Sequence, residues 1–288
     1  MSSGIVAAIY ASIFLALSQA SLKKSFRELE PSVAFFFDAM FGLFLWIPLA
    51  LYFGVNFNNL PQVMTYAIIS AILSEAFVFY ALSKGQLSLT AILVGSYPIY
   101  TIFFSYLINH EALTWVQGIF IAITILGTLV SYIPSKLSAS ELKKSGAILW
   151  PLLAAVAIGL SDTLSKKIID QTGDYTFLLA LALVQLPVAL IYLRIEKAKI
   201  LPIIKKVTNK LDDYKNVIAG SLFNIVGTGL LWISFSFSLA SIASPITATS
   251  GSIVLILALL FLDEKIKARQ IFGILLVIVG IIGISMQG

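Results

Sequence analysis

The stretch LINHEALTWVQGIFIAITILG, residues 107–127, returns in outline 153 positions later as LFLDEKIKARQIFGILLVIVG, residues 260–280. In both copies a short charged turn joins two apolar runs. The match extends without a gap over residues 83–133 and 236–286, and its most specific part is the Glu-Gln-Gly spacing. The shared residues are Ser83/Ser236, Ser88/Ser241, Leu107/Leu260, Glu111/Glu264, Gln117/Gln270, Ile121/Ile274, Ile125/Ile278 and Gly127/Gly280.

The beginnings of the two halves also match, with an offset of 143. Leu17-Ser18 corresponds to Leu160-Ser161, and Lys23-Lys24 corresponds to Lys166-Lys167. A longer polar connection at 194–215 absorbs the difference between the two offsets. We therefore expect a tandem repeat with halves at 1–133 and 147–288, joined by a connecting loop at 134–146.

The composition excludes whole classes of protein. Of the 288 residues, 59% are hydrophobic and 11% are charged, and the mean hydropathy is +0.98. A soluble domain is about half apolar and about a quarter charged. One soluble globule of this size cannot bury that excess, which must face lipid. This rules out a cytosolic enzyme, a disordered chain and a nucleic-acid binder, and the lack of period-2 alternation disfavours a β-barrel.

Apolar runs of membrane-spanning length follow one another along the whole chain. A spanning helix needs about 20 apolar residues. We read ten such runs, at 4–21, 32–53, 62–83, 87–109, 115–133, 147–168, 175–193, 216–238, 243–262 and 269–286. Each half then holds five spans, and because five is odd the second half enters the membrane from the opposite side. The predicted fold is all-α, with ten transmembrane helices as two inverted five-helix repeats around a central cavity.

The positive charges predict an orientation. The net charge is +5, and the basic residues lie mostly in the connections on one side of the predicted bundle, with Lys166 and Lys167 on the other. The positive-inside rule places the basic side in the cytoplasm and both termini outside. The first run follows Met1-Ser2-Ser3-Gly4 without a basic segment, which is not typical of a cleaved signal peptide. We expect a multi-pass protein of the cell membrane, plasma or inner.

The sequence predicts no metal, no cofactor and no enzymatic site. It contains no cysteine, and His110 is its only histidine. Thiolate and multi-histidine metal sites are therefore excluded. There is no Walker A sequence, no pair of Asp-rich motifs and no Ser-His pair, so neither ATP hydrolysis nor a membrane enzyme acting on lipid is favoured.

Several short motifs resemble a known transporter repeat. In the first half these are Phe79-Tyr80-Ala81-Leu82, Pro98, His110-Glu111-Ala112-Leu113, Gln117-Gly118 and Gly127, and in the second half Asp263-Glu264-Lys265-Ile266, Gln270, Gly273 and Gly280. Together they resemble the EamA-type repeat of the drug/metabolite transporter superfamily. The resemblance implies a ten-helix transporter whose cavity is lined by spans 1, 3, 4, 6, 8 and 9.

The chain departs from that family pattern in three ways. Gly251 stands where the first half has Pro98. Asp38 stands where such proteins often have an arginine, which puts an arginine-dependent role there in doubt. The family is usually described with cytoplasmic termini, against the charge count given above.

Three acids lie inside apolar runs: Asp38, Glu75 and Asp162. A charged carboxylate at the centre of a bilayer costs about 2.5–3.5 kcal/mol on the insertion scale. Each should therefore face protein or water, or hold a proton. Because burial disfavours the charged form, such a group can bind a proton and release it when water enters. These three residues are our candidates for proton coupling, with Glu75 first because it is central in its run.

The repeat predicts which polar residues share a central space. At the two offsets Gln19 pairs with Asp162, Glu75 with Thr228, Tyr97 with Ser250, and Ser96 with Thr249. Helical spacing adds Asn224 and Trp232 to the face that carries Thr228 and Phe235. Trp232 and Tyr97 could offer aromatic surface to a cationic ligand. The predicted substrate-binding residues are Gln19, Glu75, Ser96, Tyr97, Asp162, Asn224, Thr228, Trp232, Thr249 and Ser250.

Structural roles compete with these functional ones. Glu111 and Glu264 can stabilise helix N-termini, Gly273, Gly280 and Gly283 can permit close helix packing, and Trp232 can be a packing residue. Asp38 can pair with Lys23, Lys24 or Arg27. His110 is expected in an interfacial loop, and Lys84 at the membrane interface.

The leading functional hypothesis is a secondary transporter that moves a small amino-acid-like, cationic or amphipathic metabolite by alternating access, with proton-coupled export as one form. The alternative is an anion exchanger for phosphorylated metabolites or nucleotide sugars, which needs basic residues in the cavity. A membrane enzyme or a scaffold ranks lower. The expected partners are a small-molecule substrate, membrane lipid and protons, with no nucleic acid, and a monomer or homodimer suffices.

Overall fold

The computed structural model describes residues 2–25, 30–84, 93–132, 148–198, 211–262 and 267–287. All regular secondary structure within these residues is helical. The predicted connecting loop at 134–146 lies outside the described residues, as do Arg27 and Glu264. The side chains of Lys23, Lys24 and Lys84 also lie outside the described part, so the roles predicted for them stay predictions.

The first half of the chain forms the helices that precede residue 133. Most are α-helices, η1 is a 3-10 helix, and η2 and η3 are π-helical. Their bounds are α1 Ser3–Ser25, α2 Pro31–Phe53, η1 Phe57–Asn59, α3 Leu60–Ser70, η2 Ala71–Ala76, α4 Phe77–Lys84, α6 Tyr97–Phe104, η3 Ser105–Asn109 and α7 Trp115–Tyr132.

The second half repeats this plan. Its helices are α9 Leu149–Thr172, α10 Asp174–Glu196, α12 Leu211–Phe237, α13 Ala240–Thr247, α14 Ser250–Leu262 and α15 Ala268–Ser285. Seven segments among the described residues of the chain are long and apolar enough to cross a membrane. The predicted helical membrane architecture is therefore confirmed, while the count of ten spans stays a prediction.

Helix α9 extends beyond the apolar run predicted there. The run expected to end at 168 continues as α9 to Thr172, and Lys166 and Asp170 form an ion pair one helical turn apart. Lys166 and Lys167 lie inside this helix, as the predicted run 147–168 has them, and Lys166 is buried.

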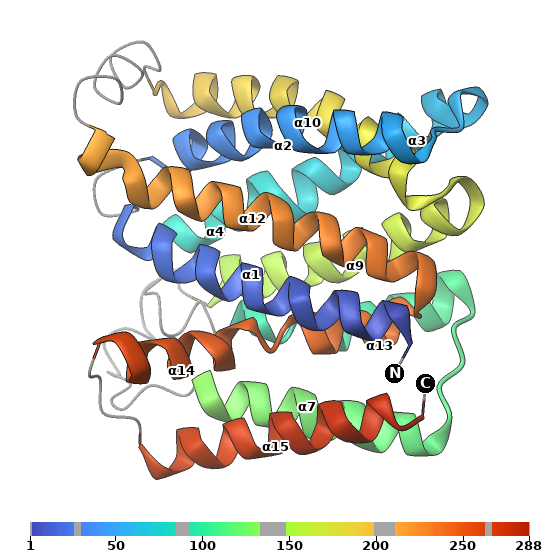
Figure 1. Ribbon diagram of the computed structural model, residues 1–288, viewed down its shortest axis with the longest axis vertical. Helices are drawn as coiled ribbons and strands as arrows, with labels where there is room; N and C mark the ends of the chain where they lie inside the picture. The colour runs from blue at the N-terminus through green and yellow to red at the C-terminus, as the bar shows by residue number, and fades with distance from the viewer. Residues whose placement is uncertain are drawn as a thin grey trace.

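The two halves pack against each other in a symmetric pattern of contacts. Helix α1 packs on α12, α13 and α14 of the second half, and α9 packs on α3, α4 and α6 of the first. Helices α2 and α10 form one pair and α7 and α15 another. Exchanging the halves maps each contact onto another contact in the same set. Figure 1 shows the pairs α2–α10 and α7–α15 at opposite edges of the bundle, with both chain termini at the same end.

The α7–α15 pair is held close by small residues. A Cβ atom added to Gly127 would lie 2.7 Å from the carbonyl oxygen of Gly273, and one added to Gly273 would lie 2.7 Å from the carbonyl oxygen of Gly127. Gly280 faces Thr124, and Gly283 faces the ring of Phe120. The packing role predicted for Gly273, Gly280 and Gly283 is therefore confirmed.

The α2–α10 pair is joined at both ends and crosses at a polar residue. The Ser32 N–H donates to Glu196 Oε2 over 3.1 Å at one end, and the Asn56 N–H donates to Thr176 Oγ1 over 3.0 Å at the other. Between them Gln185 is fully buried, with its Oε1 atom against Gly42. Residues 42 and 185 are repeat partners at the offset of 143, so the two halves meet here through equivalent positions.

Candidate functional site

Asp162 is a buried acid that accepts hydrogen bonds from both halves of the bundle. It lies near the middle of α9, with 1% of its surface exposed. Its Oδ2 atom accepts a hydrogen bond of 2.6 Å from Ser244 Oγ on α13 and one of 3.3 Å from Thr101 Oγ1 on α6. Because α6 belongs to the first half and α9 and α13 to the second, this carboxylate lies where the two halves meet.

Tyr97 extends this group of residues. It begins α6, and its hydroxyl donates to the backbone carbonyl oxygen of Ser244 over 3.0 Å. The contact between α6 and α9 is tight, because a Cβ atom on Gly159 would lie 2.7 Å from the Thr101 amide nitrogen. The Asp162 site, defined as Tyr97, Thr101, Asp162 and Ser244, therefore has aromatic, hydroxyl and carboxylate groups in direct contact.

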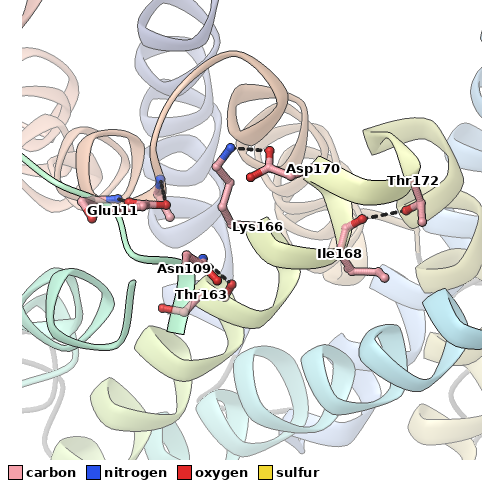
Figure 2. Close-up of polar contacts among 9 residues, drawn as sticks. Asn109, Glu111, Thr163, Lys166, Ile168, Asp170 and Thr172 are labelled. Carbon is pink, nitrogen blue, oxygen red and sulfur yellow. Dashed lines mark hydrogen bonds and ion pairs between the residues drawn. The ribbon is translucent and has the colours of Figure 1, made fainter. Parts of the chain in front are cut away.

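Further hydroxyl groups follow α9 toward the end of the bundle where the termini lie. Ser105 and Thr163 hydroxyls are 3.1 Å apart, and Asn109 Nδ2 donates to the Thr163 carbonyl oxygen over 2.9 Å. Figure 2 shows Asn109 and Thr163 in the same region as Glu111 and Lys166. Ser105, Thr163 and Lys166 are all buried, so the polar residues between Asp162 and this end of the bundle are closely packed.

Glu75 lies in the π-helical segment η2, on the other side of α9. It is 5% exposed, and none of the residues described donates a hydrogen bond to its carboxylate. One residue earlier, Ser74 is linked through Ser70 to Ser161, with hydroxyl distances of 3.3 Å and 3.0 Å. Single π-helical turns inside α-helices occur frequently at functional sites, which agrees with the functional role predicted for Glu75.

Asp38 is fully buried in α2 and contacts the second half. Its Oδ2 atom accepts a 2.7 Å hydrogen bond from Asn224 Nδ2 on α12. Its Oδ1 atom has no hydrogen-bond partner among the described residues. Asn224 is thus its hydrogen-bond partner among the described residues, and the suggested pairing with Lys23, Lys24 or Arg27 stays a prediction because their side chains lie outside the described part.

Gln19 and Ser250 form a third contact between the halves. Gln19 Nε2 donates to Ser250 Oγ over 3.2 Å, joining α1 to α14. Gln19 lies on the same face of α1 as Ser12 and Ala16, which are buried because they point into the bundle. Gln19 itself is exposed, although it lies on this inward face of α1.

The remaining predicted residues are packed or locally bonded. Trp232 is 1% exposed, and its ring lies 5.3 Å from Phe177 and 5.4 Å from Phe235 between centroids. Thr228 is buried one turn before Trp232 on α12. Thr249 Oγ1 and Ser96 Oγ donate to carbonyl groups of their own turns. The structure therefore does not bring Trp232 to the Asp162 site.

Several of the polar groups that surround the acids could not be identified from the sequence. Ser244, Thr101, Ser161, Ser70 and Gln185 were not predicted. Serine and threonine are common in membrane helices as ordinary helix-to-helix donors, so their type does not identify them. Gln185 is the exception, since an amide in the middle of an apolar run is unusual, and neither of its side-chain polar atoms has a partner within the described chain.

The charges of the buried interior are mostly negative. The buried acids are Asp38, Glu75, Glu111, Asp162 and Asp174, and the buried base within the described ranges is Lys166, which pairs with Asp170. The described residues contain no group of three or more His, Asp or Glu that could hold a metal ion. The arrangement suits hydrogen-bond donors and positive charge better than anions.

Comparison with known proteins agrees with this architecture. The sequence model of the EamA-like transporter family matches residues 2–133 and 145–286. A crystal structure with 14% sequence identity superposes with a TM-score of 0.78 over 99% of this chain and 94% of that chain, which shows the shared fold.

Two curated relatives match at the level of sequence. An uncharacterized transporter of Clostridium kluyveri is 24% identical over 229 residues, which are 77% of this chain and 71% of the relative. An uncharacterized protein of Methanocaldococcus jannaschii is 29% identical over 141 residues, which are 49% of this chain and 97% of the relative. The family match indicates a multi-pass transporter of small substrates rather than an enzyme, and the chain belongs to the EamA-like transporter family.

Proposed function

We propose that this protein is a secondary transporter that binds a small cationic or zwitterionic metabolite at the Asp162 site and carries it across the membrane by alternating access. The observation that carries the proposal is the position of Asp162, a buried carboxylate held by hydroxyl groups from both halves. Binding sites of secondary transporters with inverted repeats lie at the repeat interface near the bilayer midplane.

The chemistry of the site favours a ligand that donates hydrogen bonds. Thr101 and Ser244 satisfy Asp162 with neutral hydroxyl groups, which a ligand ammonium group can replace with a stronger charge-assisted hydrogen bond. Tyr97 adds an aromatic ring within the same set of contacts, and an aromatic face attracts a cation. A carboxylate without such partners is costly inside a membrane, so ligand and proton can substitute for each other there.

Proton coupling is the second part of the proposal. Asp38 on α2 and Glu75 in η2 are both buried on helices that contact each other, and Asn224 holds one oxygen of Asp38. Two carboxylates that influence each other do not both carry a charge without cost. Glu75 is the member that exchanges a proton, because no hydrogen bond from the described residues fixes its charged form.

The alternative, anion exchange, receives less support. It needs basic groups at the site, and the buried base of the described chain, Lys166, is already paired with Asp170. The test is a panel of amines, zwitterionic amino acids, carboxylates, phosphorylated metabolites and nucleotide sugars, read by the melting temperature of the purified protein at two pH values. Selective stabilisation by amines or amino acids supports the proposal, whereas selective stabilisation by phosphorylated ligands would overturn it.

A further inference from the structure

Glu111 makes the densest set of hydrogen bonds to one carboxylate in the described chain. It lies between η3 and α7 in the first half and is 7% exposed. Its carboxylate accepts from the Ala240 N–H over 3.1 Å, the Ser241 N–H over 2.9 Å and the Ser241 hydroxyl over 2.5 Å. These two residues begin α13, so the side chain caps a helix that belongs to the other half.

This contact, the Glu111–α13 contact, lies at one end of the bundle. Helix α13 begins at the end where both termini are marked in Figure 1. Figure 2 places Glu111 beside the Asn109–Thr163 hydrogen bond, which ties η3 to α9 at the same end. All eight residues of α13 are buried, so at this end no part of the helix is open to solvent.

The polar residues on the opposite side of Asp162 are more exposed. Gln19 is exposed although it lies on the inward face of α1, and α1 runs away from the end that holds the N-terminus. Ser96 and Tyr97 at the start of α6 are also partly exposed. The polar residues are therefore more exposed on the Gln19 side of Asp162 and packed on the Glu111 side.

Helix α13 connects Glu111 directly to the proposed substrate site. Ser241 and Ser244 are three positions apart, so they lie on the same face of the helix. The hydroxyl of the first donates to Glu111 and that of the second donates to Asp162. A single helical turn is stiff, so a shift at the beginning of α13 displaces Ser244 relative to Asp162.

We infer that Glu111 is a positioning residue whose contact with α13 holds this end of the transport path closed and links the closure to Asp162. The inference rests on the proposed function, because closure of one end has meaning only in a transporter. A carboxylate suits the task, since it accepts from several donors at once and favours a helix N-terminus. Glutamine at this position keeps the shape but turns an N–H₂ group toward backbone N–H donors.

The experiment uses the absence of cysteine from the natural sequence. Ser105→Cys places one thiol at the packed end, and Gln19→Cys places one at the open end; Ser105 is fully buried and Gln19 is exposed. The rate of maleimide labelling is measured for each in lipid nanodiscs, with and without Glu111→Gln. We expect labelling at position 105 to rise roughly tenfold and labelling at position 19 to fall, because loss of a charged hydrogen bond shifts the equilibrium toward the opposite opening.

Opposite changes in labelling at positions 105 and 19 distinguish a positioning role of Glu111 from a general loosening of the helix packing. A merely structural role of Glu111 would raise labelling at both positions together, and that result, or no change at either, would overturn the inference. Ser241→Ala removes only the hydroxyl contact and should give a smaller change in the same direction, which keeps the test valid if Glu111→Gln folds poorly. Gln171→Ala is the control, because Gln171 is exposed on α9 at the same end and does not belong to α13.

The two proposals fail separately in this design. Labelling needs no ligand, so a reciprocal change supports the role of Glu111 even when no compound of the panel is bound or transported. Parallel or absent changes together with normal transport would reject the role of Glu111 and leave the substrate site standing.

Discussion

Ser244 donates its hydroxyl hydrogen to the Asp162 carboxylate over 2.6 Å, and this contact joins α13 to the middle of α9. Thr101 reaches the same oxygen from α6. A ligand that takes over these hydrogen bonds would release both helices at once.

Replacing Asp162 by asparagine should lower uptake of a cationic ligand into proteoliposomes by at least roughly tenfold, the effect of losing one charge-assisted hydrogen bond. The asparagine side chain keeps an oxygen for Ser244 and Thr101, so the melting temperature should change little. Glu30→Gln is the control, since Glu30 is exposed just before α2 and should leave uptake unchanged. Wild-type uptake by the Asp162 variant would remove this residue from the site.

Replacing Glu75 by glutamine should abolish the pH dependence of uptake, because an amide cannot exchange a proton. The measurement is the initial rate of uptake into proteoliposomes across a range of external pH. Glu30→Gln serves as the control, because Glu30 is exposed just before α2 and should not alter the pH profile. An unchanged profile in the Glu75 variant would show that the coupling group lies elsewhere.

Replacing Gly127 by alanine should lower the stability of the bundle by about 1–3 kcal/mol, the usual cost of overpacking a close contact. The new methyl group would meet the Gly273 carbonyl oxygen at 2.7 Å, and backbone cannot move aside as a side chain can. Gly118→Ala on the same helix has nothing within 4 Å and should be neutral or slightly stabilising. Melting temperatures in detergent distinguish the two variants, and equal values would contradict the close α7–α15 packing.

Replacing Trp232 by phenylalanine should destabilise the protein by about 1–3 kcal/mol through loss of packed volume. Its ring lies against Phe177 and Phe235 rather than at the Asp162 site. The melting temperature should therefore fall while the stabilisation caused by a bound ligand stays the same. Trp115→Phe is the control, because Trp115 is 84% exposed. A lost ligand response in the Trp232 variant would restore the substrate contact expected from its sequence position.

The features that could be predicted from the sequence are those that a single residue type indicates, such as a charged side chain whose transfer into lipid costs free energy. Asp38, Glu75 and Asp162 stand out because a charge is expensive in lipid, and all three are buried at contacts between helices. The glycines of the α7–α15 pair could be predicted for a different reason, because Gly127 and Gly280 occupy equivalent positions in the repeat. The helical membrane architecture and the identity of the three buried acids could therefore be predicted from the sequence.

The contact partner of each side chain could not be predicted, because it depends on which helices pack against each other. Trp232 has the same spacing whether its face packs on Phe177 or borders a ligand, and only the contact between α10 and α12 decides between them. Asp38 and Asn224 were both named as candidates, but the hydrogen bond between them joins two halves of the chain, and no spacing along the sequence indicates it. The π-helical turn at Glu75 has no counterpart in residue type, so periodicity alone predicted an ordinary helix there.

The crossing of α2 and α10 has a consequence for how such a chain can arise. Gln185 fills the space that Gly42 leaves open, although the two occupy equivalent positions in their halves. A dimer of two identical halves would carry the same residue twice at this crossing, which gives either two amides in collision or a hole between two glycines. When both copies are joined in one gene, a large residue in one half and a glycine in the other can become complementary. Replacing either half by a duplicate of the other would therefore disrupt the packing at the α2–α10 crossing.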